Sequence, residues 1–162
     1  MDQQLNIGFK LSHRDLCEIG GRFLKTTTFY ELKCSYVVVE LVSYSQETPD
    51  IFGVDGYKSV LIEVKMSKTD FKNDARKKFR KEGNKALGQQ RYYLCPEELL
   101  NPDEMPKNWG LLYCNSSGKI SYIKDATPFP DNERNFYGEM VIIKSILRRL
   151  GIKPQVFNFR GF

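Results

Sequence analysis

The chain has 162 residues, a length typical of one domain that can bury a hydrophobic core without disulfide or metal support. Hydrophobic residues make up 41% of it, aromatic residues 13% and charged residues 28%, which excludes collagen-like, low-complexity and wholly disordered chains. The formal net charge is +5, so the position of the excess basic residues is informative about partners.

The composition also bears on the cell compartment. No apolar run reaches the eighteen or so residues that span a bilayer, and residues 1–10 lack the basic and apolar order of a signal peptide. We therefore expect a cytoplasmic protein with no membrane partner, in which residues 1–162 form a single domain. The four cysteines form no C-x-x-C pair, which argues against zinc knuckles and predicts reduced core cysteines. Because the chain has a single histidine, His13, we expect no His-rich metal site and no His-dependent nuclease or hydrolase chemistry. His13 itself is expected at the surface, in the first turn of a helix.

A helix and a strand are predicted first along the chain. Ser12 followed by Asp15 is typical of a capping box, and apolar residues at helical spacing predict a helix over 12–25. Residues 34–42 are β-branched and apolar almost throughout, which predicts a buried strand that ends near Glu40.

A hairpin is predicted next. Residues 51–54 and 58–65 are apolar segments on either side of Asp55 and Gly56, a pair typical of a two-residue hairpin turn. With that turn, Val54 pairs with Tyr57 and the register of the whole hairpin follows.

The excess positive charge lies after this hairpin. Between residues 72 and 85 there are seven basic residues against two acidic ones, and the rest of the chain is balanced. A second capping box at Ser67 and Asp70 and an apolar stripe at helical spacing predict that one helix, ended by Gly83, carries the basic residues. The stripe is Phe71, Ala75 and Phe79. We interpret the basic residues as a nucleic-acid-binding surface, because each neutralised phosphate releases counterions; the alternative is a solvated helix face. They are Lys72, Arg76, Lys77, Lys78, Arg80, Lys81 and Lys85.

The second half of the chain predicts strands and a last helix. A short helical stretch over 85–90 should lead into a strand over 91–95, and residues 109–114 and 119–124 should form a second hairpin. Residues 132–150 are amphipathic and should form a helix docked on the sheet, with homodimer formation through that helix as the alternative.

The first hairpin also carries the candidate chemistry. Side chains alternate between the faces of a strand, so Leu61, Glu63 and Lys65 should project to the same side. The expected register sets Asp50 opposite Leu61, diagonal to Glu63 and on the same face. Charge at the end of an apolar strand is costly unless it is paired or binds a cation.

These carboxylates suit a hard divalent cation. Asp50 and Glu63, with Glu40 as a third acid if its strand lies alongside, offer oxygen ligands and open positions, which favour Mg²⁺ or Mn²⁺. Lys65 could then orient an attacking water or stabilise charge on a phosphate. The alternative is a plain salt bridge between Glu63 and Lys65.

The same residues resemble a known family. The motif of Asp50 after proline, then Glu63 and Lys65 two residues apart, is similar to the PD-(D/E)XK nuclease superfamily. The E-x-K-x-S-x-x-D-F run that begins at Glu63 resembles the MmcB-like DNA-repair nucleases and their phage-borne relatives, as do the segments over 88–97 and 106–112. The resemblance covers about 34–125 and leaves the last helix outside.

The resemblance implies an α+β fold, with a mixed central sheet flanked by helices in a restriction-endonuclease-like core. It implies Mg²⁺- or Mn²⁺-dependent hydrolysis of DNA phosphodiester bonds, with Asp50 and Glu63 as metal ligands and Lys65 organising the water. Glu40 is the expected further acid and metal ligand, although Glu18 competes for that role.

Further residues have a weaker match to family motifs. Gln89 and Tyr93 resemble the Gln and Tyr motif of RecB-like members, but we interpret Gln89 and Gln90 as polar residues on a helix face. Ser67 is interpreted as a helix cap. The alternatives to a nuclease are an inactive nucleic-acid-binding module of the same fold and an oligomerisation or partner-binding protein that uses the last helix.

Overall fold

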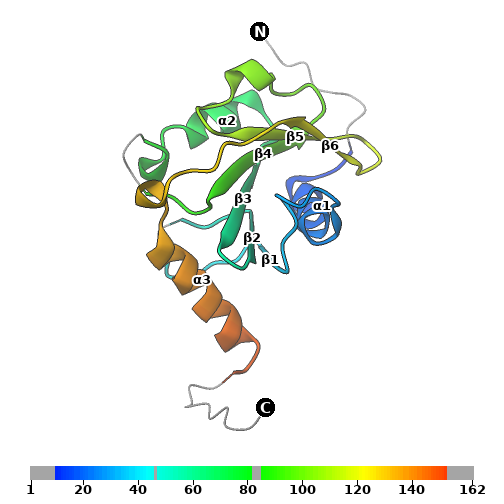
Figure 1. Cartoon of the computed structure of the whole chain (residues 1–162). Helices are drawn as coiled ribbons and strands as arrows, with labels where there is room; N and C mark the ends of the chain where they lie inside the picture. The colour runs from blue at the N-terminus through cyan, green and yellow to red at the C-terminus, as the bar shows by residue number, and fades with distance from the viewer. Residues whose placement is uncertain (1–9, 46, 82–84, 153–162) are drawn as a thin grey trace.

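A computed structural model describes residues 10–45, 47–81 and 85–152 (Figure 1). Its strands form one six-stranded sheet in the order β1-β2-β3-β4-β5-β6. The strands are β1 (Tyr36–Val39), β2 (Ile51–Asp55), β3 (Lys58–Val64), β4 (Gln90–Pro96), β5 (Gly110–Cys114) and β6 (Ile120–Lys124). The α-helices are α1 (His13–Thr26), α2 (Lys68–Asp74) and α3 (Phe136–Arg149), and the 3-10 turns are η1 (Lys78–Arg80), η2 (Pro102–Glu104) and η3 (Asp131–Glu133).

The sheet is mixed. Antiparallel pairs join β1 to β2, β2 to β3 and β5 to β6, whereas β3, β4 and β5 run parallel. The carboxyl ends of β3, β4 and β5 therefore lie at one edge of the sheet. The expected α+β fold with a mixed central sheet is confirmed.

Different layers cover the two faces of the sheet. Helix α1 buries Leu16 and Leu24 against a core that includes Ile62 and Leu94. On the other face, Leu61 and Tyr93 belong to a second core, which Phe71 of α2 and Ile142 of α3 also join. Figure 1 shows α1 and α2 on opposite sides of the sheet. None of the helices in the described ranges is long and apolar enough to cross a bilayer.

The capping prediction for α1 is confirmed. The Ser12 hydroxyl accepts the Asp15 N–H, and the Asp15 carboxylate accepts the Ser12 N–H. Two orphan donors of the first turn are thereby satisfied, which fixes where α1 begins.

The β2–β3 hairpin forms with a different turn from the one expected. Asp55 pairs with Lys58, so Gly56 and Tyr57 make the turn, and Gly56 takes the left-handed conformation with φ at +57°. The register consequently moves by two residues. Ile51, the first residue of β2, stands opposite Ile62, so Leu61 pairs with Phe52 instead of Asp50, which precedes the strand. A shift of two preserves the face of every side chain, because the strand repeat is two.

Strand β1 is shorter and less buried than predicted. It covers four residues at the edge of the sheet, and its side chains are exposed or half-buried. The prediction of a buried strand over 34–42 was wrong. An apolar run does not show whether a strand has neighbouring strands on both sides or lies, like β1, at the edge of the sheet.

The predicted long basic helix is also wrong. Helix α2 ends at Asp74, Ala75 is exposed, and the chain continues through η1. Gly83, expected to end the helix, lies outside the described residues. Residues 85–90 form no helix and contain only an isolated bridge between Ala86 and Arg134. Buried contacts of Asp74, described below, break the helical course.

Helix α3 departs most from its expected packing. Ile142 is fully buried, but Met140 is 61% exposed and Leu150 71% exposed. Figure 1 shows the helix extending away from the sheet. Its first turn is held by Glu139, whose carboxylate pairs with Arg134 at 2.9 Å. Docking of the whole apolar stripe on the sheet was therefore the wrong interpretation.

Alanine substitutions test this placement of α3. We expect Ile142→Ala to lower the free energy of unfolding by about 2–4 kcal/mol, because it removes a buried side chain. Met140→Ala should change it by less than about 0.5 kcal/mol, because its side chain faces solvent. Urea denaturation measures both. Equal costs for the two variants would contradict an exposed stripe.

Candidate functional site

The candidate site lies at the carboxyl end of β3. Glu63 is paired with Tyr93 of β4, and Asp50 directly precedes β2, the strand on the other side of β3. Lys65 follows the strand, and its N–H donates to the Leu94 carbonyl at 2.9 Å. The register thus brings the two acids and the lysine of the sequence motif to adjacent strand ends.

Asp50 is fixed by the backbone of β3. Its Oδ2 accepts the Val64 N–H at 2.8 Å and lies 3.5 Å from His13 Nε2. The Glu40 N–H donates to the Asp50 carbonyl at 2.8 Å. Glu40 lies beside Asp50, as the sequence predicted for a neighbouring strand. Glu18, the competing acid, is exposed and pairs with Arg14 at 3.4 Å.

Glu63 and Lys65 belong to a buried ion-pair network. Each side chain is only 3% exposed, and Lys65 Nζ lies 3.4 Å from Glu63 Oε2. Lys65 Nζ is equally 3.4 Å from Asp74 Oδ1, which α2 brings in at its last residue. The Tyr93 hydroxyl donates to Asp74 Oδ2 at 2.7 Å. The salt bridge that remained open as an alternative is therefore present, but as one part of a larger group.

Basic residues from the segment after α2 close this network. Arg80 Nη2 lies 3.2 Å from Glu63 Oε1, and Arg80 Nε donates to Asp74 Oδ2 at 2.9 Å. Arg80 also pairs with Glu47, whose other oxygen accepts the Leu87 N–H at 2.8 Å. Lys77 reaches Asp74 Oδ1 at 2.7 Å.

The predicted nucleic-acid-binding residues therefore divide into two kinds. The Arg80 side chain is 4% exposed, so its assignment to a solvent-facing surface was wrong. Lys77 is 44% exposed and ion-paired. The other members are exposed, but they follow one another around α2, η1 and the adjoining turns instead of sharing one helix face. These are Lys72, Arg76, Lys78, Lys81 and Lys85.

The two buried carboxyls differ in their proton affinity. Burial raises the pKa of Glu63 to about 7, and Asp50 adds to the rise, against the opposing effect of Arg80 and Lys65. Burial also disfavours ionised Asp74, but Arg80 and Lys65 together hold its pKa well below the usual range. Glu63 is thus the acid of this network whose charge is least compensated.

Hydrogen-bond geometry agrees with this assignment. Glu63 Oε1 and Arg80 Nη2 are both buried and have no hydrogen-bond partner, although they lie 3.2 Å apart. A buried acceptor without a hydrogen bond is unusual in a native structure. An added cation at Glu63 would bind an oxygen that Arg80 approaches without a hydrogen bond, and would relieve the burial penalty.

The auxiliary residues are only partly at the site. Tyr93 contacts the network directly through Asp74. Gln90 is the first residue of β4, so it lies at the end of the strand opposite the site, where it is paired with Val60. Gln89 precedes the strand. The expectation that both glutamines lie on a helix face was wrong, because this segment is extended. Ser67 is a helix cap, as interpreted, and its hydroxyl accepts the Asp70 N–H at 3.1 Å.

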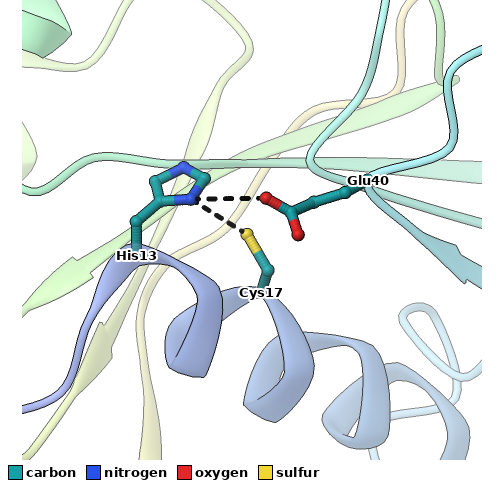
Figure 2. Close-up of side chains that lie close together, drawn as sticks. All are labelled: His13, Cys17 and Glu40. Carbon is teal, nitrogen blue, oxygen red and sulfur yellow. Dashed lines mark hydrogen bonds and ion pairs between the residues drawn. The ribbon is translucent and has the colours of Figure 1, made fainter.

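A second group of side chains, missed by the sequence analysis, meets beside Asp50. Figure 2 shows His13, Cys17 and Glu40 converging, with one histidine nitrogen toward both partners. Cys17 Sγ lies 3.5 Å and Glu40 Oε1 3.7 Å from His13 Nδ1. His13 is thus more than a surface residue. The signal for this group in the sequence was the four-residue spacing between His13 and Cys17, which puts both side chains on one face of a helix.

The four cysteines otherwise lie in the core, as the sequence predicts. All four cysteines are free and buried. Burial raises the pKa of the Cys17 thiol, and the nearby Asp50 and Glu40 carboxylates raise it further. The surroundings of Cys17 therefore carry negative potential, which favours a cation.

Comparisons with known proteins support the fold alone. No protein-family model matches the chain, and no curated protein sequence matches it. Among solved structures it is similar to SPO1766, a protein of unknown function from Silicibacter pomeroyi. The TM-score is 0.61 at 19% identity, over 88% of this chain and 89% of that one. Such a likeness supports the α+β architecture and gives no evidence about activity.

The raised pKa of Glu63 predicts a pH-dependent stability. An unfolded glutamate loses its proton near pH 4.5, whereas folded Glu63 retains it up to about pH 7. Between these values the native state binds more protons, so the stabilisation from Glu63 is complete below pH 4.5 and is lost as pH rises to 7. The free energy of unfolding of wild type should therefore fall relative to Glu63→Gln across this window.

Urea denaturation with a chelator present measures the difference at each pH. The Glu63→Gln variant serves as its own control, because all other groups titrate in both proteins. Asp74 does not interfere, since its lowered pKa places its titration below the window. A difference that is constant from pH 4.5 to 7 would show that Glu63 is ionised throughout.

Proposed function

We propose that the protein is a metal-dependent nuclease that hydrolyses DNA phosphodiester bonds in repair, recombination or the processing of phage or mobile-element DNA. The observation that carries this proposal is the meeting of the three motif residues at the end of β3, where the Val64 N–H donates to Asp50 Oδ2 at 2.8 Å and Lys65 Nζ lies 3.4 Å from the Glu63 carboxylate. Two acids and a lysine at the end of a mixed sheet form the set that the resemblance to PD-(D/E)XK nucleases implies.

The donor set fits a hard divalent cation. Asp50 and Glu63 offer carboxylate oxygens, and Glu63 Oε1 is buried without a hydrogen bond. Mg²⁺ and Mn²⁺ prefer such oxygens and keep positions for water and phosphate. Bound there, the ion would lower the pKa of a water ligand and offset charge on the phosphate.

The protein residues have separate roles in this proposal. Asp50 and Glu63 hold the cation, and the Val64 N–H fixes the Asp50 carboxylate through its 2.8 Å hydrogen bond. Lys65 provides a positive charge that orients water or stabilises the developing phosphate charge. Its ammonium is already positioned by Glu63 and Asp74, so little reorganisation is needed.

The exposed basic residues complete the proposal. Lys72 lies in α2, and Arg76 and Lys81 lie on the connection after α2, which Arg80 attaches to the buried network. Contacts of such residues with phosphates supply affinity without base specificity. Arg80 is excluded from this role and holds the connection on Glu63 and Asp74 instead.

Plasmid nicking tests the proposed activity. We expect wild type to nick supercoiled DNA with Mg²⁺ or Mn²⁺ and to be inactive with a chelator. Asp50→Asn and Lys65→Met should reduce the rate at least about 100-fold, because each removes a group that acts on the reacting phosphate. Asp55→Asn is the matched control, since Asp55 is on the same hairpin at the other end of β2, and it should keep full activity.

Two results would contradict a nuclease. Equal nicking by wild type, Asp50→Asn and Lys65→Met would assign the activity to another protein in the preparation. Salt-sensitive DNA binding that needs no metal, with no cleavage of plasmid or oligonucleotides, would instead support the inactive nucleic-acid-binding module.

A further inference from the structure

We propose that His13, Cys17 and Glu40 form a second metal site, which takes a borderline-soft divalent transition metal, Zn²⁺ above all. It is separate from the oxygen ligands of Asp50 and Glu63, and it does not depend on nuclease activity. No ligand of this site comes from the buried ion-pair network.

The distances suit one small ion. Cys17 Sγ lies 3.5 Å and Glu40 Oε1 3.7 Å from His13 Nδ1, and the three ligand atoms lie within 4.8 Å of one another. Zinc bonds of about 2.0–2.3 Å in a tetrahedron separate the ligand atoms by roughly 3.3–3.6 Å. The two shorter separations are therefore already close to those of a zinc site. Figure 2 shows the three side chains around a common point.

The donor types decide which metal fits. A thiolate and an imidazole favour Zn²⁺ and similar ions over Mg²⁺ and Ca²⁺, which prefer oxygen ligands throughout. Three protein ligands leave the fourth tetrahedral position open for water or a phosphate oxygen, as in catalytic zinc sites. Structural zinc sites, by contrast, use four protein ligands.

The ligands stand on fixed backbone. His13 and Cys17 are one turn apart in α1, whose first turn is fixed by the Ser12–Asp15 capping box. Glu40 has a left-handed backbone with φ at +48°, which is costly for a residue with a side chain and is held by its hydrogen bond to Asp50. Such strain is concentrated at functional sites.

Exposure provides access from solvent. The side chains of His13 and Glu40 are 39% and 46% exposed, whereas Cys17 is fully buried. An ion can therefore enter from the His13 and Glu40 side and meet the sulfur at the floor of the group.

Asp50 would support this site without being a ligand. Its Oδ2 lies 3.5 Å from His13 Nε2, the ring nitrogen opposite the one that faces Cys17 and Glu40. Metal-bound histidines commonly use their second nitrogen for a carboxylate, which fixes the ring and raises its basicity. Asp50 would thus position His13 for the softer ion.

Cobalt titration of the full-length, metal-stripped protein tests the proposal. We expect one equivalent of Co²⁺ to produce a thiolate-to-cobalt charge-transfer band and the visible bands of a tetrahedral site, and Zn²⁺ to displace it. Cys17→Ser should abolish the charge-transfer band. His13→Gln and Glu40→Gln should weaken Zn²⁺ binding at least about tenfold, measured by competition with a chelating dye.

Control variants distinguish loss of metal binding from misfolding and from loss of nuclease activity. Cys114→Ser also replaces a buried cysteine and should retain the band. His13 and Glu40 are half-exposed, so their variants should fold even if Cys17→Ser does not. A wild-type protein without the band, or a band unchanged in Cys17→Ser, would overturn the proposal, as would unchanged Zn²⁺ affinity in His13→Gln. Failure of plasmid nicking would overturn only the proposed function.

Discussion

The burial of Glu63 at the end of β3 is the constraint on which the rest of this structure depends. A carboxylate removed from water must be neutralised by protonation, by cationic side chains or by a metal ion. Here Lys65 and Arg80 approach it, and the same groups bind Asp74. The network therefore attaches the connection after α2 to the sheet, and it leaves Glu63 Oε1 with an ion pair to Arg80 but without a hydrogen bond.

Asp50 links this network to the group around His13. Its carboxylate accepts a hydrogen bond from the Val64 N–H of β3 and lies near the His13 ring. In our account the oxygen ligands select Mg²⁺ or Mn²⁺, and the thiol and imidazole select Zn²⁺. Two ions of different chemistry would then meet at one strand end, with Asp50 as a ligand of one and a support for the other.

Local signals in the sequence were sufficient for part of this arrangement. The cap of α1, the β2–β3 hairpin and the position of Glu40 beside Asp50 follow from turn chemistry and strand alternation. The misplaced turn moved the register by two residues, which leaves the faces of the paired β2 and β3 residues unchanged. The end of α2 at Asp74 and the exposure of Met140 depend on contacts distant in sequence, which no local pattern contains. The grouping of His13 with Glu40 was missed because Glu40 is distant in sequence and lies in another layer of the fold.

The most direct test of the central claim is calorimetric titration of Mn²⁺ in a Cys17→Ser background, where the softer site cannot contribute. We expect binding that is lost in Asp50→Asn and in Glu63→Gln and retained in Asp55→Asn. Equal Mn²⁺ affinity in all four proteins would contradict the account, because Asp50 and Glu63 would then be only structural carboxylates.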